Sequence, residues 1–403
     1  MVVYYFTTTH SMHSIQLLIE EVKQIKDYRK PRGQRYRLHN LLSIIILSVI
    51  AGADDYVAIS EYCKSKKDFL LKHNLIDGIN YPSHDLFRLI LQSLNKEQFA
   101  KLLANWISRA VELQELPNTN NIKSPQKMIH IDGKSLRASR SGRQHTRSAL
   151  QIVTAYCSNH SVSVGQSIID KKSCEKTAIP QLLRMIDIRY ALITIDAIAS
   201  FKKNAELIID LEADYLLALK KNNKHLFLEV ESFFNNFEDT SLIVDVFQSE
   251  DKAHGRIEKR KCQIISDLRF FPDVKDWKGI KSLICVTSQR TLNGKTSHEK
   301  RYYVSSLKPD AEILASAIRK HWTVENELHW SLDVAFNEDR CRIKHKQAAA
   351  NFAAIRRFAL ALLKNVKLSK IGIKNQRLKA AWSNDFLEKI FTFFLTVSQQ
   401  NTY

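Results

Sequence analysis

Acidic side chains gather in one stretch of the chain that also has helical periodicity. Residues 319–342, with the sequence RKHWTVENELHWSLDVAFNEDRCR, contain five carboxylates: Glu325, Glu327, Asp333, Glu338 and Asp339. Trp322, Glu325 and His329 stand at positions i, i+3 and i+7, which share one face of a helix. A neighbouring face carries an apolar stripe made of Val324, Leu328, Leu332 and Ala335. The pattern predicts one long helix over residues 310–336. Glu338 and Asp339 then lie past the helix end, where they are predicted to pair with Arg340 or Arg342.

A carboxylate on a partly apolar helix face needs a partner, because burying an unpaired charge costs several kcal/mol. Glu325 has two candidate kinds of partner. The first is an ion pair with a basic residue of the same stretch, Arg319, Lys320 or His321. The second is a cation shared with carboxylates from elsewhere in the chain. The choice depends on whether the rest of the sequence supplies such carboxylates.

Two aspartates at predicted strand ends supply them. Asp132 ends the strand MIHID, and Asp196 ends the strand ALITID. Ligands gather at the carboxyl ends of strands in α/β sheets. Three crowded carboxylates repel one another unless cations intervene, and oxygen ligands suit Mg²⁺ or Mn²⁺. Two such ions clamp the attacking and leaving oxygens of a phosphodiester, so Asp132, Asp196 and Glu325 are the predicted catalytic and metal-binding residues.

Other interpretations of the same residues stay open. An aspartate at a strand end more often caps a turn, and a lone glutamate on a helix more often belongs to a surface ion pair. His321, Glu325 and His329 could in principle chelate zinc, but the metalloprotease motif, with two histidines four residues apart on a helix and a glutamate between them, is absent. Oxygen ligation is favoured because Asp, Asp and Glu fall in order on strand, strand and helix of a basic protein.

The charge of the chain indicates a polyanionic partner. Its 403 residues include 61 lysines and arginines against 42 aspartates and glutamates, a formal net charge of +19. Such an excess is typical of proteins that bind nucleic acid. The alternative is a basic protein that is merely soluble. It ranks second because the basic residues cluster around the candidate site.

The sequence predicts a cytoplasmic protein without a membrane span. Six scattered cysteines show neither zinc-knuckle nor redox spacing, which is typical of reduced thiols in the cytosol. The first residues lack the pattern of a secretory signal. The longest apolar run, residues 41–53, is too short to cross a bilayer and predicts a buried helix.

Helical patterns fill the first part of the chain. The predicted helices cover residues 14–22, 38–53, 54–67, 85–94 and a further segment through Trp106 and Leu113. Ser83 is a predicted N-cap, and residues 27–37 form a basic turn broken by Pro31 and Gly33. Together these elements predict an all-α domain over residues 1–115, followed by a linker.

After the linker the pattern changes to strands and then alternates between helix and strand. The predicted strands are residues 128–132, 150–157, 162–169, 191–196 and 215–219, and the predicted helices are residues 179–187, 202–211 and 224–237. No dinucleotide-binding glycine pattern follows the first strand. The order β-β-β-α-β-α-β-α matches a ribonuclease-H-like core, in which the first and fourth strands are neighbours. This first part of the core covers residues 127–239.

A β-rich insertion is predicted over residues 240–300, with a hairpin turn at Asn293-Gly294. The core resumes over residues 301–370 with its final strand and the catalytic helix. Residues 371–403 form a C-terminal helical tail. The predicted fold is therefore of the α+β or α/β class, an N-terminal all-α domain followed by a mixed-sheet domain.

The insertion contains the basic run HGRIEKR at residues 254–260. One interpretation is an exposed hairpin corner with Gly255 at positive φ. The favoured interpretation is a basic finger on a phosphate backbone.

Eight runs of the chain resemble the DDE transposases of the H-repeat-associated insertion-sequence group. They lie at residues 27–36, 51–61 (AGADDYVAISE), 82–87, 130–137 (HIDGKSLR), 194–197 (TIDA), 214–222 (DYLLALKKN), 254–260 and 321–340. The phrase HWTVENELHWSLDVAFNEDR is the most specific of them. The chain departs from related transposases at His321, where an arginine is usual.

The resemblance implies that Asp132, Asp196 and Glu325 hold two Mg²⁺ or Mn²⁺ ions. The enzyme would cut insertion-sequence ends and join their 3′-hydroxyls to target DNA. Contacts to double-stranded DNA would come from Lys134, Arg137, His254, Arg256, Arg260 and His329. Pairing two DNA ends implies a homodimer in the DNA complex, in a bacterial cytoplasm and associated with the nucleoid. The alternatives are a metal-dependent nuclease on the same fold and an inactive remnant that only binds DNA.

Overall fold

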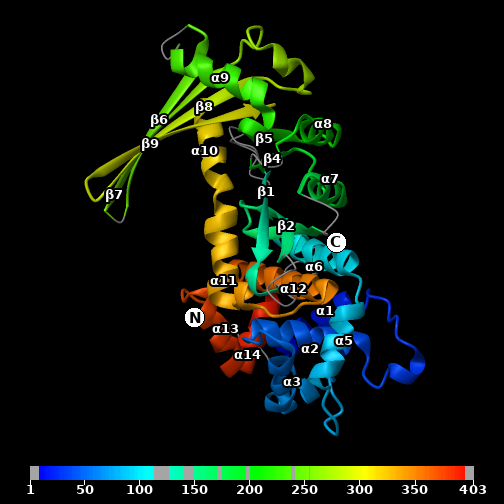
Figure 1. The fold of residues 1–403 in the computed structure, drawn as a ribbon. Helices are drawn as coiled ribbons and strands as arrows, with labels where there is room; N and C mark the ends of the chain where they lie inside the picture. Colours follow the sequence, from blue (N-terminus) through cyan, green and yellow to red (C-terminus); the bar gives the residue numbers. More distant parts are fainter. Residues whose placement is uncertain are drawn as a thin grey trace.

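The computed structural model describes residues 9–112, 127–139, 149–169, 175–196, 200–236, 241–253 and 255–394. His254, one of the predicted DNA-binding residues, lies outside these ranges. Helices gather at one end of the molecule, the sheet lies at the other, and α10 (Ala311–His321) with α11 (Trp330–Phe336) runs between them (Figure 1). In the described ranges, no helix combines the length and apolarity needed to cross a membrane.

The N-terminal helices follow the predicted pattern. They are α1 (Thr9–Val22), α2 (Leu38–Ile50), α3 (Tyr56–Ser65), α4 (Lys67–Lys72), α5 (His84–Ser93) and α6 (Lys96–Glu112). Eleven residues of α2 are buried, because a helix that is apolar all round has to be surrounded by others. Ser83 caps α5 as predicted, and its hydroxyl accepts a hydrogen bond from the backbone N–H of Leu86.

Nine strands form one continuous sheet in the order β3-β2-β1-β4-β5-β9-β8-β7-β6. They are β1 (Lys127–Leu136), β2 (Leu150–Cys157), β3 (Val162–Ile169), β4 (Ala191–Ile195), β5 (Asp214–Leu219), β6 (Ile243–Ala253), β7 (Arg256–Ile265), β8 (Ser282–Leu292) and β9 (Lys295–Ser305). Strand β4 runs parallel to β1 and β5, and the other neighbours are antiparallel. The first five strands therefore have the predicted ribonuclease-H-like order.

The β-rich insertion extends this sheet, because β9 returns to pair with β5. Asn293 and Gly294 turn β8 into β9 with φ of 50° and 75°, as a two-residue hairpin of type I′ requires. Gly255, at the corner between β6 and β7, also has a positive φ of 71°. The predicted hairpin turn at Asn293-Gly294 is confirmed. Gly255 has the positive φ of the hairpin-corner interpretation, and the favoured interpretation of residues 254–260 as a basic finger on DNA stays a prediction.

Helices cover both faces of the sheet. On one face, α7 (Glu175–Met185), α8 (Lys202–Asp210) and α9 (Lys224–Asn236) pack against a core that includes Ile129 and Ile193. On the other face, α10 packs against Met128 and Leu192. Successive residues of a strand face opposite sides, so this alternation decides which polar residues of β1 and β4 face α10.

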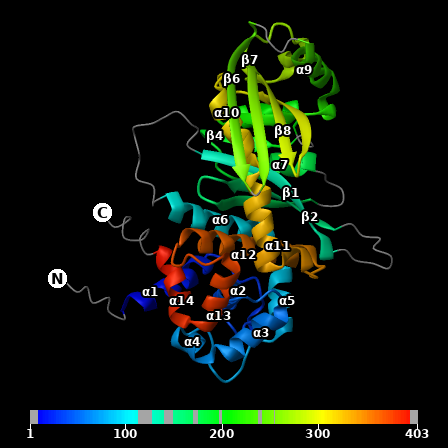
Figure 2. The same ribbon diagram turned by 90° about the vertical axis from the view of Figure 1, so that its left-hand side faces the viewer.

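The C-terminal helices return to the N-terminal ones and share their apolar core. They are α12 (Lys346–Asn365), α13 (Ile373–Trp382) and α14 (Asn384–Phe391). Helices α1 and α14 lie side by side (Figure 2), and the hydroxyl of Ser14 donates to the carbonyl of Glu388 (3.1 Å). The predicted domain limits stay a prediction, but the helical unit is built from both ends of the chain.

Candidate active site

Asp132 on β1 and Asp196, directly after the neighbouring strand β4, lie at the same level of the sheet. β1 and β4 pair in parallel as far as Ile131 and Ile195, so the aspartates are the next residue on each chain. Their predicted placement on adjacent strands is confirmed. One detail differs, because β1 continues past Asp132 to Leu136 along β2. Asp132 therefore marks the end of the pairing with β4, whereas the strand itself goes on.

Both aspartates belong to the α10 face of the sheet. Met128 and Leu192 lie on this face, and Asp132 and Asp196 are an even number of residues further along the same two chains. The side chain of Asp132 is 31% exposed and that of Asp196 is 50% exposed. Two carboxylates thus stand open to solvent beside the helix that carries the third candidate residue.

The helix predicted over residues 310–336 is not continuous. Between α10 and α11 lies the six-residue π-helical segment η7 (Val324–His329). The N–H of Trp330 bonds to the carbonyl of Glu325, five residues back, where an α-helix reaches back four. Such wide turns are rare and frequently mark functional sites. Glu325 lies within this one.

The wide turn changes which side chains face the sheet. One additional residue in a turn rotates everything after it by about 100°. In a continuous α-helix, His321 and Asp333 would lie about 120° apart, and the additional residue reduces this angle to about 20°. Accordingly, His321 contacts Thr194 of β4, and Asp333 contacts Lys134 of β1.

Trp322, Glu325 and His329 are predicted to share one helix face, but the wide turn separates His329 from the other two. His329 is 8% exposed, and its Nδ1 lies 3.5 Å from Oδ2 of Asp132. Trp322 and Glu325 are exposed. The apolar stripe is buried in the core that the helical unit shares with Tyr156 of β2, and not in the core around Met128 and Leu192: Val324, Leu328, Leu332 and Ala335.

Two histidines share one threonine hydroxyl next to the aspartates. Oγ1 of Thr194 lies 2.7 Å from Nδ1 of His130 and 2.7 Å from Nδ1 of His321. Burial lowers the pKa of His130 to about 3 and that of His321 to about 4, although Asp196 opposes the second shift. Both rings are therefore neutral near pH 7. They connect β1, β4 and α10 without adding positive charge beside the aspartates.

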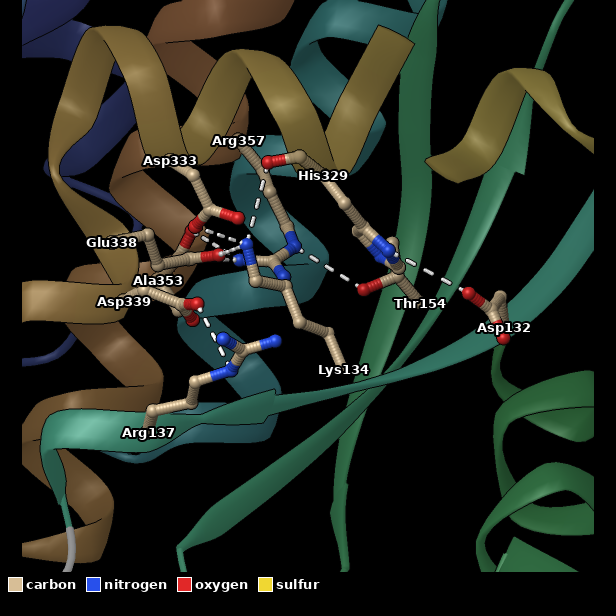
Figure 3. A network of polar contacts seen from close by, with 10 residues as sticks. All are labelled: Asp132, Lys134, Arg137, Thr154, His329, Asp333, Glu338, Asp339, Ala353 and Arg357. Atoms are coloured by element: carbon tan, nitrogen blue, oxygen red, sulfur yellow. Dashed lines mark hydrogen bonds and ion pairs between the residues drawn. The ribbon is translucent and has the colours of Figure 1, made fainter. Parts of the chain in front are cut away.

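Lys134 is the centre of a buried charge network (Figure 3). Its ammonium donates to the carboxylate of Asp333 and to the carbonyl oxygen of His329 (3.3 Å). It also lies 3.5 Å from Oε2 of Glu338. The network therefore connects β1 with the end of η7, with α11 and with the turn after α11.

Glu338 is fully buried, and its Oε1 lies 2.8 Å from Nη1 of Arg357 on α12. Burial opposes its ionisation, but Arg357 and Lys134 lower the pKa of Glu338 to about 2. The predicted pairing of Glu338 with Arg340 or Arg342 is wrong. The turn after α11 folds Glu338 inward, where two buried cations from other elements surround it.

The residues predicted to contact DNA phosphates lie in different environments. Lys134 and His329 are buried and bonded within the protein. Arg137 is 81% exposed, with Nε 3.4 Å from Oδ2 of Asp339. The three phosphate contacts stay predictions, and the exposure of Arg137 suits such a contact best.

Arg256 and Arg260 lie on β7 beside acidic residues. Arg260 is 2.6 Å from Glu258 and 2.7 Å from Asp251, and Arg256 is 3.5 Å from Glu258. Asp251 also pairs with Arg319 of α10. These ion pairs connect the β-rich insertion to the helix of the candidate site.

A pocket of about 380 Å³ opens beside Asp196, between the ends of β4 and β5, the middle of β9 and helix α10. Nζ of Lys220 lies 3.5 Å from Oδ1 of Asp196, and the guanidinium of Arg301 lies over the ring of Trp322 at 4.7 Å. Further basic and aromatic residues line the pocket: Lys221, Lys300, Phe227, Tyr302 and Tyr303. A concave surface with a cationic rim next to an acidic residue suits a phosphodiester chain.

Asp132, Asp196 and Glu325 do not form a ready-made metal cluster. Within the described ranges, no three His, Cys, Asp or Glu side chains come together to hold a metal ion, and this includes the zinc alternative with His321 and His329. The three acids nonetheless offer carboxylate oxygens that solvent reaches, and the carboxylate of Glu325 bonds to no described residue. Such oxygen donors fit Mg²⁺ or Mn²⁺.

Comparison with known proteins places this chain in a family. The Transposase DDE domain family matches residues 123–363, and the DDE_Tnp_1-associated family matches residues 19–107. The chain therefore belongs to the Transposase DDE domain family.

Its relatives include two proteins of Escherichia coli (strain K12). YbfL is 34% identical over 383 residues, which are 93% of this chain and 98% of YbfL. The "H repeat-associated putative transposase YhhI" is 33% identical over 383 residues, with the same two coverages. The resemblance to the H-repeat-associated group is confirmed.

Proposed function

We propose that this chain is a metal-dependent transposase that cuts the ends of insertion-sequence DNA and joins their 3′-hydroxyls to target DNA. The observation that carries the proposal is the parallel register of β1 and β4. It sets Asp132 and Asp196 side by side on the face of the sheet that the helix of Glu325 covers. Membership of the Transposase DDE domain family supports the same assignment.

The three carboxylates would hold two Mg²⁺ or Mn²⁺ ions, which supply Lewis-acid stabilisation of charge on phosphate oxygens. The chain's own residues prepare the site. Burial lowers the pKa of His329 to about 3, so its ring lies beside Asp132 as a neutral group and adds no positive charge there. The cationic rim beside Asp196, with Lys220 and Arg301, binds and orients the DNA backbone.

DNA cleavage tests this proposal. Purified protein is incubated with a labelled element end in the presence of Mg²⁺ or of EDTA. A transposase gives Mg²⁺-dependent cleavage and then labelled strands joined to a target plasmid. Cleavage without joining indicates the nuclease alternative, and binding without cleavage indicates the inactive remnant. We also propose that two copies act together in the bacterial nucleoid, one at each element end.

Salt dependence tests the proposed DNA surface. The affinity for DNA is expected to fall steeply as salt rises, because bound lysines and arginines release counterions. Arg256→Ala is expected to flatten the slope of log K against log salt by roughly one unit. Arg260→Ala is expected to flatten it by less, because Asp251 and Glu258 already neutralise that guanidinium. Equal slopes for wild type and Arg256→Ala would show that this part of β7 does not contact DNA phosphates.

A further inference from the structure

Two lysines from different elements hold the wide turn that contains Glu325. Lys134 of β1 donates to the carbonyl of His329 (3.3 Å), and Lys364 of α12 donates to the carbonyl of Glu327 (3.4 Å). Nζ of Lys364 also lies 3.5 Å from the carboxylate of Glu327. Two carbonyls of η7 are thus bonded by side chains from the sheet and from the helical unit.

Lys134 is buried, and Lys364 is partly buried, with a side chain that is 18% exposed. Lys134 is 8% exposed, and burial lowers the pKa of Lys364. Taking a charged amine out of water is unfavourable unless it is paired and hydrogen-bonded. These partners are backbone oxygens of one short segment and carboxylates next to it. Such contacts explain how the segment is held, whereas a DNA phosphate would require an accessible amine.

Lys134 also acts close to the candidate metal ligands. On the same face of β1, two residues earlier, Asp132 meets the ring of His329 (3.5 Å). Lys134 donates to the carbonyl oxygen of His329 and to the carboxylate of Asp333 on α11. Strand β1 therefore contacts η7 through two residues on one face, Asp132 and Lys134. Without the hydrogen bonds of Lys134, the wide turn is expected to relax toward an α-helical register.

We propose that Lys134 is a positioning residue for the metal site. It fixes the register of η7 so that Glu325 shares a cation with Asp132 and Asp196, and it does not bind phosphate. Lys364 supports the same segment from the opposite side. This inference rests on the proposed function.

The test compares three folded proteins: wild type, the double variant Lys134→Met/Asp333→Asn and the control Lys72→Met. The double variant removes the amine together with one of its carboxylates, which limits the uncompensated charge. Lys72 also pairs with a buried glutamate, Glu388 (2.8 Å), but in the helical unit. Terbium alone, without DNA, is titrated by its luminescence, which Trp322 and Trp330 sensitise.

The double variant is expected to bind terbium roughly 10- to 100-fold more weakly, the usual effect of losing a residue that orients metal ligands. Amide hydrogens of residues 324–336 should exchange faster, kcat for cleavage should fall, and DNA affinity should stay unchanged. Lys72→Met should match wild type in all four measurements. The conservative Lys134→Arg, which keeps a cation able to donate to both partners, should recover part of the terbium affinity.

Unchanged terbium affinity in the double variant, together with a salt slope flattened by roughly one unit, would make Lys134 a phosphate ligand and overturn the proposal. Failure of the proposed function gives a different result, in which wild type itself neither cuts DNA nor binds terbium. Hydrogen exchange then still tests whether Lys134 holds η7 in place. Equal exchange over residues 324–336 in wild type and the double variant would overturn the positioning role.

Discussion

Replacing Glu325 by glutamine is expected to abolish metal-dependent DNA cleavage and to leave folding and DNA binding intact. The loss of a ligand removes several kcal/mol of charge stabilisation, which corresponds to a fall in rate of roughly 10³-fold or more. Glu325 is exposed, and its carboxylate bonds to no described residue, so the substitution removes no side-chain contact within the described residues. Asp132→Asn and Asp196→Asn are expected to behave alike. Single-turnover cleavage and a DNA-binding titration measure the two effects separately.

Glu327 provides the matched control on the same segment. Its carboxylate contacts the hydroxyl of Tyr156 (3.2 Å) and lies near Lys364, so it is directed toward neighbouring elements. Glu327→Gln is expected to keep measurable cleavage. Normal cleavage by Glu325→Gln together with an inactive Glu327→Gln would show that Glu327, and not Glu325, is the catalytic residue.

Glu338→Gln is expected to destabilise the folded protein strongly. The fully buried carboxylate faces Arg357 at 2.8 Å and Lys134 at 3.5 Å. Removing one member of a buried charge pair costs about 3–5 kcal/mol, because the remaining charge is left uncompensated. Urea unfolding measures the change in the free energy of unfolding. Below its unfolding temperature the variant should still cleave DNA, since Glu338 is not a proposed metal ligand.

A second substitution identifies the cause of that loss. Exchanging both Glu338→Leu and Arg357→Met removes the two charges together, and it is expected to cost less than Glu338→Gln alone. A double variant that is as unstable as the sum of the two single changes would show that the pair is not coupled.

The charge of Glu338 also predicts a pH dependence. Its pKa in the folded protein, about 2, lies below the ordinary value of 4.5. The ionised carboxylate therefore stabilises the fold fully above pH 4.5, and this contribution is lost as the pH falls toward 2. The free energy of unfolding of wild type should approach that of Glu338→Gln over this interval. Parallel curves for the two proteins down to pH 3 would contradict the assignment.

The strand order could be predicted because it depends on local patterns. Runs of β-branched residues separated by helices give the ribonuclease-H-like order, and that order places Asp132 beside Asp196 without knowledge of any distant contact. The break of the long helix could not be predicted. Its apolar spacing is helical throughout, and the additional residue in η7 is needed only because His321 and Asp333 must both reach the sheet.

The burial of Lys134 had a signal in the sequence. His130, Asp132 and Lys134 alternate along one strand, so all three face the same side. Ending the strand at Asp132 placed Lys134 in a loop, where a phosphate contact is the natural interpretation. The partner of Arg357 had no such signal. An arginine in an apolar helix predicts burial with an acid, but Glu338 is one of several candidates.

The central claim, that Asp132, Asp196 and Glu325 share divalent ions, is tested most directly by metal-directed cleavage of the protein itself. Fe²⁺ replaces Mg²⁺ in the purified chain, and ascorbate with peroxide generates radicals at the bound iron. The expected result is backbone cleavage near residues 132, 196 and 325, suppressed by excess Mg²⁺ and absent in Asp132→Asn. Cleavage near Asp333 and Asp339 that persists in Asp132→Asn would contradict the claim.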